Sequence, residues 1–229
     1  MHLEMVKFIS GMNKNFPMRS VDKVAISKQF SKILRHTASE IPELSIRADG
    51  YVELKSILAL PFFVQNNVDE RFVRAMVEAD SKTRFSLLQK GNRLYIRANQ
   101  GHSERVARGI DTDSLHEFIE SADEIPKVVH GTNLGAWEHI KHEGLKRMSR
   151  SHIHFAPGIL GDEGVRSGMR ASAYIHIYVN AAKAMSEGIR FYRSANNVIL
   201  SDGIDGVIDP RYFSRVVDSR SGTVLFSRD

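Results

Sequence analysis

The sequence predicts an α+β protein with two lobes, and three observations support this fold class. In the first half, apolar residues at helical spacing precede a stretch that alternates around a Gly-Asn turn. In the second half, short strand patterns follow one another without the long helical spacers of a doubly wound sheet. An acidic stretch, DTDSLHEFIESADEIP, separates the two patterns. We therefore expect an N-terminal extension (1–25), a first lobe (26–110), a boundary segment (111–126) and a second lobe (127–229).

The first lobe is predicted to contain two helices followed by a hairpin. Four apolar residues between positions 26 and 34 follow helical spacing behind Ser27, which indicates a capped helix that ends near Arg35 and His36. A turn at Asp49-Gly50 precedes a short strand over 51–54, and a second helix is expected over 69–79. Residues 84–98 alternate around the Gly91-Asn92 turn. Helices followed by a hairpin are typical of a winged-helix module.

The second lobe is predicted to be a mixed sheet with few helices. One helix is expected over 134–143, closed by Gly144, and the boundary segment is expected to be partly helical. Strands are expected over residues 127–130, 152–156, 173–179, 190–193 and 198–200.

Composition excludes several classes of protein. The chain has no cysteine, which excludes a disulfide framework and a thiolate zinc site, and its ten histidines lack metal-binding spacings, so we expect no metal. No apolar run of about 18 residues occurs, and charges interrupt the N-terminal stretch, so neither a membrane span nor a secretory signal is expected. A cytoplasmic protein is predicted. The net charge of +5 favours an acidic partner such as nucleic acid only weakly.

Several basic residues are candidates for binding phosphate. Arg35 and His36 end a predicted helix, where they serve either as C-terminal caps or as ligand contacts. Arg84 opens the hairpin, and Arg170 follows a Ser-Gly-Met loop; each is either a solvated surface residue or a phosphate clamp. Guanidinium groups bind phosphate oxygens in bidentate fashion, so arginines that converge from separate segments would form a phosphate site. Spacing along the chain leaves that convergence open.

The end of the predicted hairpin carries polar groups next to a glycine. Asn99, Gln100, Gly101, His102 and Ser103 end the hairpin and form either a simple turn or a surface that approaches a ligand.

The segment at 130–132 combines polar groups with a strand end. His130, Gly131 and Thr132 end a predicted strand, where the histidine is either buried and satisfied or a ligand contact. The nearby stretch at 149–154 adds polar donors that packing alone does not explain. It contains Ser149, Arg150, Ser151, His152 and His154.

The chain carries a series of short segments that, in their order along the sequence, resemble the NAD-dependent RNA (tRNA) 2′-phosphotransferase family, which includes KptA-like enzymes. The resemblance spans about residues 27–213 and leaves out the first twenty or so. It rests on LRHTA at 34–38, DGYV at 49–52, RF at 84–85, NQGHS at 99–103, HGT at 130–132, MSRSHIHFAPG at 148–158, SGMR at 167–170 and FYRSANNVIL at 191–200.

The resemblance implies a winged-helix lobe that binds RNA and a second lobe with an ADP-ribosyltransferase-like sheet that binds NAD. It also implies a two-step reaction. The RNA 2′-phosphate attacks C1″ of NAD and releases nicotinamide, and the ribose 2″-hydroxyl then attacks the ADP-ribosylated phosphate. The products would be RNA with a 2′-hydroxyl and ADP-ribose 1″,2″-cyclic phosphate. NAD would be consumed as a co-substrate, and an RNA bearing a 2′-phosphate would be the partner.

The resemblance also assigns roles to the candidate residues. Arg35, His36, Arg84 and Arg170 match the catalytic set, and the Asn99 to Ser103 segment would contact RNA. The remaining matches would contact NAD: His130, Gly131, Thr132, Ser149, Arg150, Ser151, His152, His154, Arg193 and Ser194.

Two alternatives stay open at this point. An ADP-ribosyltransferase that caps terminal phosphates of RNA or DNA would use the same site and stop after the first step. A non-catalytic winged-helix protein that binds nucleic acid would fit the charge and the hairpin, but it leaves the HGT and SRSHIH segments unexplained. The sequence leaves the physiological RNA and the oligomeric state open.

Overall fold

The computed structural model describes residues 22–111, 115–159, 161–162, 165 and 167–228. Most of the predicted N-terminal extension therefore lies outside the described residues. The helices are α1 (Lys23–Lys32), α2 (Leu54–Leu58), α3 (Pro61–Gln65), α4 (Glu70–Glu78), α5 (Glu104–Ala107), α7 (Leu134–Glu143) and α8 (Ala181–Ser186). A π-helix, Ile33–Thr37, continues α1, and short 3-10 turns lie at Ala38–Glu40, Ala122–Glu124 and Pro210–Tyr212.

The strands form antiparallel sheets, which confirms a mixed α+β fold. The strands are β1 (Val52–Glu53), β2 (Phe85–Lys90), β3 (Arg93–Ala98), β4 (His116–Phe118), β5 (Val129–Thr132), β6 (Leu145–Lys146), β7 (Ile153–Phe155), β8 (Ile175–Val179), β9 (Tyr192–Ser194), β10 (Ile199–Ser201), β11 (Val207–Ile208), β12 (Phe213–Asp218) and β13 (Thr223–Ser227). Within the described residues, the sheet orders are β1-β3-β2, β4-β9-β10-β7, β11-β6 and β13-β12-β8-β5.

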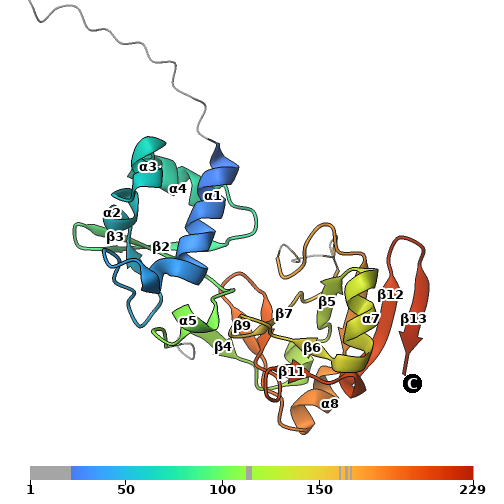
Figure 1. The fold of residues 1–229 in the computed structure, drawn as a ribbon. Helices are drawn as coiled ribbons and strands as arrows, with labels where there is room; N and C mark the ends of the chain where they lie inside the picture. The colour runs from blue at the N-terminus through green and yellow to red at the C-terminus, as the bar shows by residue number, and fades with distance from the viewer. Residues whose placement is uncertain (1–21, 112–114, 160, 163–164, 166, 229) are drawn as a thin grey trace, which may run out of the picture.

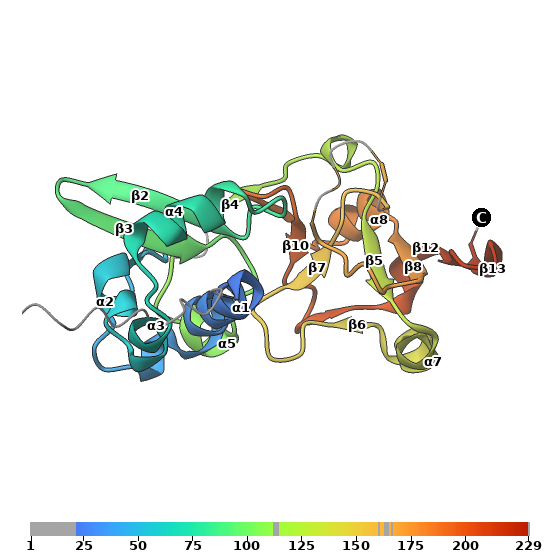
Figure 2. The ribbon, with the colours of Figure 1, turned by 90° about the horizontal axis from the view of Figure 1, so that it is seen from above.

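Two large hydrophobic clusters hold the chain together. One is built from buried residues between Ile26 and Ala98 and includes Phe30 and Phe63, whose ring centroids are 4.6 Å apart. The other is built from residues between Ile119 and Val216 and lies among the sheets of the second half. Figures 1 and 2 show α1 to α4 and the β2–β3 hairpin at one end of the molecule, with β12 and β13 at the other.

The first helix begins five residues earlier than the sequence predicts. Asp22, and not Ser27, is its N-cap, and the Asp22 carboxylate accepts hydrogen bonds from the backbone N–H groups of Val24 and Ala25. An aspartate at this position satisfies N–H groups that have no partner within the helix. Ser27 therefore lies inside α1, and the expected first boundary after residue 25 cuts the helix.

Asp22→Ala should lower the free energy of unfolding by about 1 kcal/mol because α1 loses its side-chain cap. Ser27→Ala is the matched control, and it should change stability by less than about 0.5 kcal/mol. Urea unfolding of both variants checks this expectation. An equal loss in the two variants would contradict the assignment of Asp22 as the cap.

The turn after α1 is a π-helix that carries Arg35 and His36. The backbone N–H of Ala38 donates to the carbonyl of Ile33, five residues earlier, where an α-helix would bond four residues earlier. The carbonyl of Arg35 accepts from the backbone N–H of Ser103 at 2.8 Å, which ties this turn to the end of the hairpin. The expected helix end near Arg35 is thus a change of helix type, followed by a 3-10 turn.

Several predicted elements are confirmed. The helix expected over 69–79 is α4, capped by Asp69, whose carboxylate accepts from the Phe72 N–H at 2.7 Å. The hairpin is β2–β3, and the helix over 134–143 is α7, which Gly144 closes with a φ of +79°. The boundary segment is partly helical through the 3-10 turn Ala122–Glu124 and also contains the strand β4, while residues 112–114 lie outside the described part.

Two sheets meet where β5 passes β7. Val129 and Ala156 exchange backbone hydrogen bonds of 3.0 and 2.8 Å, and from this point β5 pairs with β8 while β7 pairs with β10. His130 follows Val129 directly, and His154 precedes Ala156 by two residues. The divergence of the two sheets therefore brings the two histidines together.

Candidate active site

A cavity of about 490 Å³ gathers arginines from four separate segments. Arg35 comes from the π-helix, Arg84 from the loop before β2, Arg150 from the bend before β7 and Arg170 from the loop before β8. No aspartate or glutamate belongs to the described residues that line this cavity. Four guanidinium groups without a lining carboxylate create a strongly positive cavity, which suits an anion with several oxygens.

Arg35 is the most buried of these arginines and is poorly satisfied. Its Nε and Nη2 atoms are buried and have no hydrogen-bond partner. Burial, followed by the positive charges of Arg150 and Arg84, lowers the pKa of Arg35 to about 10. The group stays charged near neutral pH. A buried, charged donor without a partner is costly unless a ligand completes its bonding, so Arg35 indicates an anion site.

Arg150 lies close enough to Arg35 and Arg170 for their positive charges to interact. Burial lowers its pKa, and the charge of Arg170 adds to the effect. A backbone bridge between Arg150 and Ser103 holds this bend against the end of the hairpin. The sequence resemblance grouped Arg150 with NAD contacts, while the structure brings it into one cavity with Arg35, Arg84 and Arg170.

Two histidines line the cavity from β5 and β7. The Nδ1–H of His130 donates to the backbone carbonyl of His154 at 2.9 Å, so the neutral ring keeps Nε2 as an acceptor. Burial lowers the pKa of His130, and Arg150 and Arg170 oppose its protonation as well. Burial also lowers the pKa of His154 strongly, and its Nε2 has no hydrogen-bond partner. The cavity thus offers neutral imidazoles beside fixed positive charges.

Gly131 permits a close approach between β5 and the loop of Arg170. A Cβ at this position would lie 2.3 Å from Met169 Cγ and 2.9 Å from Ala173 Cβ, so no side chain fits there. Thr132 and Asn133 follow at the cavity wall, and Asn133 caps α7 by accepting from the Ala136 N–H at 2.9 Å. The N-terminus of α7 therefore lies at the cavity, where its dipole favours negative charge.

His36 is the one residue of the predicted catalytic set that does not line the cavity. Its side chain is exposed on the π-helix beside Arg35. Partial burial lowers the pKa of His36, and the positive charges of Arg150 and Arg35 lower it as well. Two arginines of the cavity therefore act electrostatically on His36.

The segment Asn99 to Ser103 mainly supports the cavity wall. Gln100 lines the cavity, whereas the Asn99 amide donates to the Thr83 carbonyl at 2.7 Å. Gly101 adopts a φ of +85° and lies under the Arg35 guanidinium, where a Cβ would contact it at 3.5 Å. The assignment of this segment to RNA contact remains a prediction, and only Gln100 reaches the cavity.

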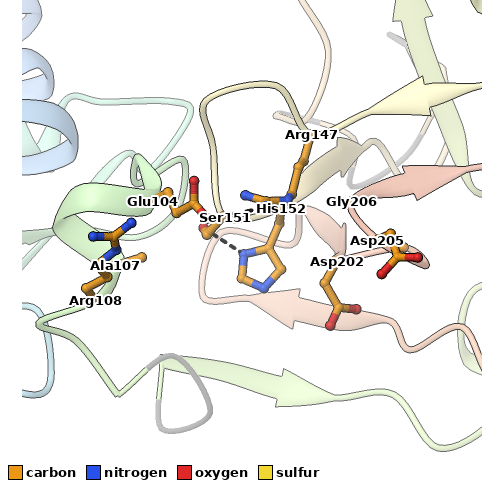
Figure 3. Close-up of a pocket in the computed structure, with 10 residues that line it drawn as sticks. Glu104, Ala107, Arg108, Arg147, Ser151, His152, Asp202, Asp205 and Gly206 are labelled. Atoms are coloured by element: carbon orange, nitrogen blue, oxygen red, sulfur yellow. Dashed lines mark hydrogen bonds and ion pairs between the residues drawn. The ribbon is translucent and has the colours of Figure 1, made fainter.

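Ser151 and His152 line a different and wider cavity of about 660 Å³ (Figure 3). The two side chains contact each other, with Ser151 Oγ 2.9 Å from His152 Nδ1. This cavity has mixed charge: Arg147 pairs with Glu104 at 3.2 Å, and Asp202 and Asp205 lie opposite. Such a lining suits an anion less well than the arginine cavity does.

The remaining predicted contacts lie outside both cavities. The Ser149 carbonyl accepts from the Glu104 N–H, and His102 is buried with its carbonyl bonded to Ser151. Arg193 donates to Asn197 Oδ1 and to the Glu124 carbonyl, so its guanidinium is engaged within the protein. Ser194 Oγ donates to Asn196 and accepts from the Val198 N–H, which closes the turn between β9 and β10.

Lys82 lines the arginine cavity and was not singled out from the sequence. The available signal was its place two residues before Arg84 in one short loop. Among the described residues, no group of three or more histidine, aspartate or glutamate side chains could hold a metal ion. No helix in the described part of the chain is long and apolar enough to cross a membrane.

Comparison with known proteins identifies the family. The profile of the "RNA 2′-phosphotransferase, Tpt1 / KptA family" matches residues 21–203. The chain belongs to this family. The resemblance seen in the sequence is confirmed, and with it the assignment to the RNA 2′-phosphotransferases, a class of transferases.

Similar proteins occur in yeast and vertebrates. The chain is 46% identical over 204 residues to a putative tRNA 2′-phosphotransferase of Schizosaccharomyces pombe, covering 89% of this chain and 53% of that protein. It is 41% identical over 208 residues to tRNA 2′-phosphotransferase 1 of Danio rerio, covering 89% and 88% respectively. It is 40% identical over 202 residues to the human protein of that name, covering 86% and 76%. The chain thus spans about half the length of the fission yeast relative and most of the vertebrate ones.

Proposed function

We propose that this protein removes the internal 2′-phosphate of a tRNA splice junction and transfers it to NAD. The observation that carries this proposal is the convergence of Arg35, Arg84, Arg150 and Arg170 on one cavity without a lining carboxylate. Relatives named as tRNA 2′-phosphotransferases over most of the chain support the choice of substrate. A cytoplasmic location remains part of this proposal.

Both anions of the reaction fit the donors that the cavity offers. Arg35, Arg84 and Arg170, with His36 at the rim, would hold the RNA 2′-phosphate, because fixed guanidinium groups offset repulsion between phosphates. His130, Thr132 and His154 would contact NAD along the β5 and β7 wall. The unpartnered Nε2 of His154 and the N-terminus of α7 are suitable for hydroxyl groups and phosphate oxygens. We place Arg150 between the two anions.

In the first proposed step, an oxygen of the RNA 2′-phosphate forms a bond to C1″ of the nicotinamide ribose. The bond from C1″ to the nicotinamide nitrogen breaks with its electron pair, and neutral nicotinamide leaves. The arginines hold the attacking phosphate in place, which lowers the entropic cost of bringing two anions together. His130 orients the ribose end of NAD.

In the second proposed step, the ribose 2″-hydroxyl attacks the phosphorus, and the bond from phosphorus to the RNA 2′-oxygen breaks. The proton of the attacking hydroxyl leaves, and the RNA 2′-oxygen gains one. His36 is suited to carry a proton because its lowered pKa keeps the neutral form at neutral pH. The arginines stabilise the charge that develops on the phosphoryl oxygens.

The two lobes expected from the sequence form part of this proposal. The first hydrophobic cluster and the β2–β3 hairpin are consistent with a winged-helix lobe over 26–110 that binds RNA. The second cluster and the split between β5 and β7 are consistent with an ADP-ribosyltransferase-like lobe over 127–229. We place the junction in the segment 111–126.

The decisive experiment uses a short RNA with one internal 2′-phosphate, incubated with the protein in the presence and absence of NAD. We expect loss of the phosphate only with NAD, together with ADP-ribose 1″,2″-cyclic phosphate. ADP-ribosylated RNA as the final product would favour the capping activity. Binding of RNA without any consumption of NAD would favour a non-catalytic nucleic-acid binder.

His130→Ala should lower kcat/KM for NAD in the first step by about 10- to 100-fold, because NAD loses its proposed contact with the imidazole ring on β5. Release of nicotinamide under single-turnover conditions measures this step. His139→Ala, which changes an exposed histidine on α7, is the control. A normal first step in His130→Ala would remove His130 from the NAD site.

A further inference from the structure

The carboxylate of Asp80 holds both the backbone and the side chain of Arg84. Asp80 follows the C-terminus of α4, and its side chain is 9% exposed. Its Oδ2 accepts from the backbone N–H of Arg84 at 2.7 Å, and its Oδ1 accepts from the backbone N–H of Lys82 at 3.1 Å. The same Oδ1 pairs with Arg84 Nη1. One buried carboxylate therefore fixes the loop and one guanidinium.

The loop has other supports, so its shape does not depend on the charge of Asp80 alone. The Thr83 N–H donates to the Asp80 carbonyl at 2.8 Å, and the Asn99 amide donates to the Thr83 carbonyl at 2.7 Å. The Asn196 amide donates to the Lys82 carbonyl at 3.0 Å. These contacts use backbone carbonyls and would remain if the carboxylate became an amide.

The direction of Arg84, in contrast, depends on that charge. Arg84 lies close enough to Arg35 for the two positive charges to repel each other, and its side chain is 35% exposed. A long arginine side chain loses conformational entropy when it is held in one position, so without a partner it would move toward solvent. Asp80 does not belong to the described residues that line the cavity. Asp80 therefore contacts the site through Arg84, and its negative charge also acts on Arg35.

We propose that Asp80 is the positioning residue of the phosphate site: its carboxylate holds the Arg84 guanidinium against the repulsion of Arg35 and aims it at the transferred phosphate. This inference rests on the proposed function. It makes Asp80 a determinant of the turnover step rather than of substrate capture. Loss of the Asp80 carboxylate has two opposite effects on anion binding. It removes a negative charge near the cavity, which strengthens binding, and it releases Arg84, which weakens binding.

The kinetic test compares wild-type protein with Asp80→Asn on the 2′-phosphorylated RNA with NAD. We expect kcat to fall about tenfold or more, while KM for the RNA changes by less than about threefold. Glu70→Gln is the matched control, because Glu70 also pairs with an arginine four residues away, on α4 and outside the cavity. This control should keep wild-type kcat and KM.

A second measurement reads the position of Arg84 without any reaction. In ¹⁵N-labelled protein, the Nε–Hε signal of Arg84, assigned by its loss in Arg84→Lys, should be distinct in the wild type. In Asp80→Asn it should move to the averaged position of mobile arginines. If Asp80→Asn fails to fold, Asp80→Ser keeps a hydroxyl acceptor for the loop and serves in its place. Thermal unfolding of each variant reports whether the fold is intact.

The outcomes separate this inference from the proposed function. A kcat within about twofold of wild type in a folded Asp80 variant, or an unchanged Arg84 signal with reduced thermal stability, overturns the positioning role. An inactive wild type overturns the proposed function, while the Arg84 signal still shows whether Asp80 holds the guanidinium. A mobile Arg84 together with low kcat and near-normal KM supports the inference.

Discussion

Arg170→Ala should reduce formation of ADP-ribose 1″,2″-cyclic phosphate by about 10²–10³-fold, and ADP-ribosylated RNA should accumulate. A donor aimed at charge that develops in a transition state is typically worth about 2.7–4 kcal/mol. Arg170 has no ion-pair partner within the described part of the chain, and it lies at the cavity close enough to lower the pKa of Arg150. Its charge is therefore available to the phosphate.

The measurement is a time course that separates both RNA species and the nucleotide products. Arg215→Ala, which changes an exposed arginine on β12 outside the cavity, is the matched control and should keep wild-type rates. Normal turnover in Arg170→Ala would place Arg170 outside the site. If no ADP-ribosylated RNA formed at all, the first step would be lost, and Arg170 would serve NAD rather than the second transfer.

Lowering the pH from about 6.5 to 5 should reduce the free energy of unfolding by about 3 kcal/mol through two buried histidines. Burial lowers the pKa of His102 to about 3, and burial lowers that of His116 to about 4, with neighbouring histidines as the next cause in each case. Both values lie below the ordinary 6.5 of an unfolded chain. The unfolded state therefore binds more protons in this range, so stability is full above pH 6.5 and falls as the pH decreases.

Urea unfolding at several pH values between about 7 and 5 measures this slope, in a range where most carboxyl groups of the unfolded chain do not yet titrate. His102→Asn and His116→Asn should each make the dependence shallower by up to about 1.4 kcal/mol per pH unit. His139→Asn, at an exposed position on α7, should leave it as it is. Equal slopes in all three variants would contradict the assignment.

Strong local signals explain which elements could be predicted from the sequence. The Gly91-Asn92 turn and the alternation around it identify β2 and β3, and Asp69 and Gly144 mark the ends of α4 and α7. The last hairpin gives a weaker signal. A register shift within β12 separates its inward-facing Phe213 and Val216 by three residues, which breaks the period of two that identifies a strand.

The candidate site could be predicted only in part, because convergence depends on long-range packing. Arg84 and Arg170 share no local pattern, and only the resemblance grouped them. Arg150 could not be placed among them, because its direction depends on a bend that pairs with Ser103, far away in the sequence. The role of Gly131 likewise follows from Met169, a neighbour in space but not in the chain.

The π-helix at Ile33–Thr37 makes the cavity sensitive to chain length as well as to residue type. An α-helix turns by about 100° per residue, so a single-residue deletion that restored regular α-helix upstream of Arg35 would rotate its side chain by about that angle. All four arginines would still be present, and the buried faces of the helix could still pack. The composition of the site would be unchanged, but its most buried charge would face another direction. In this chain the identity of the arginine and the irregular turn that carries it form one functional unit.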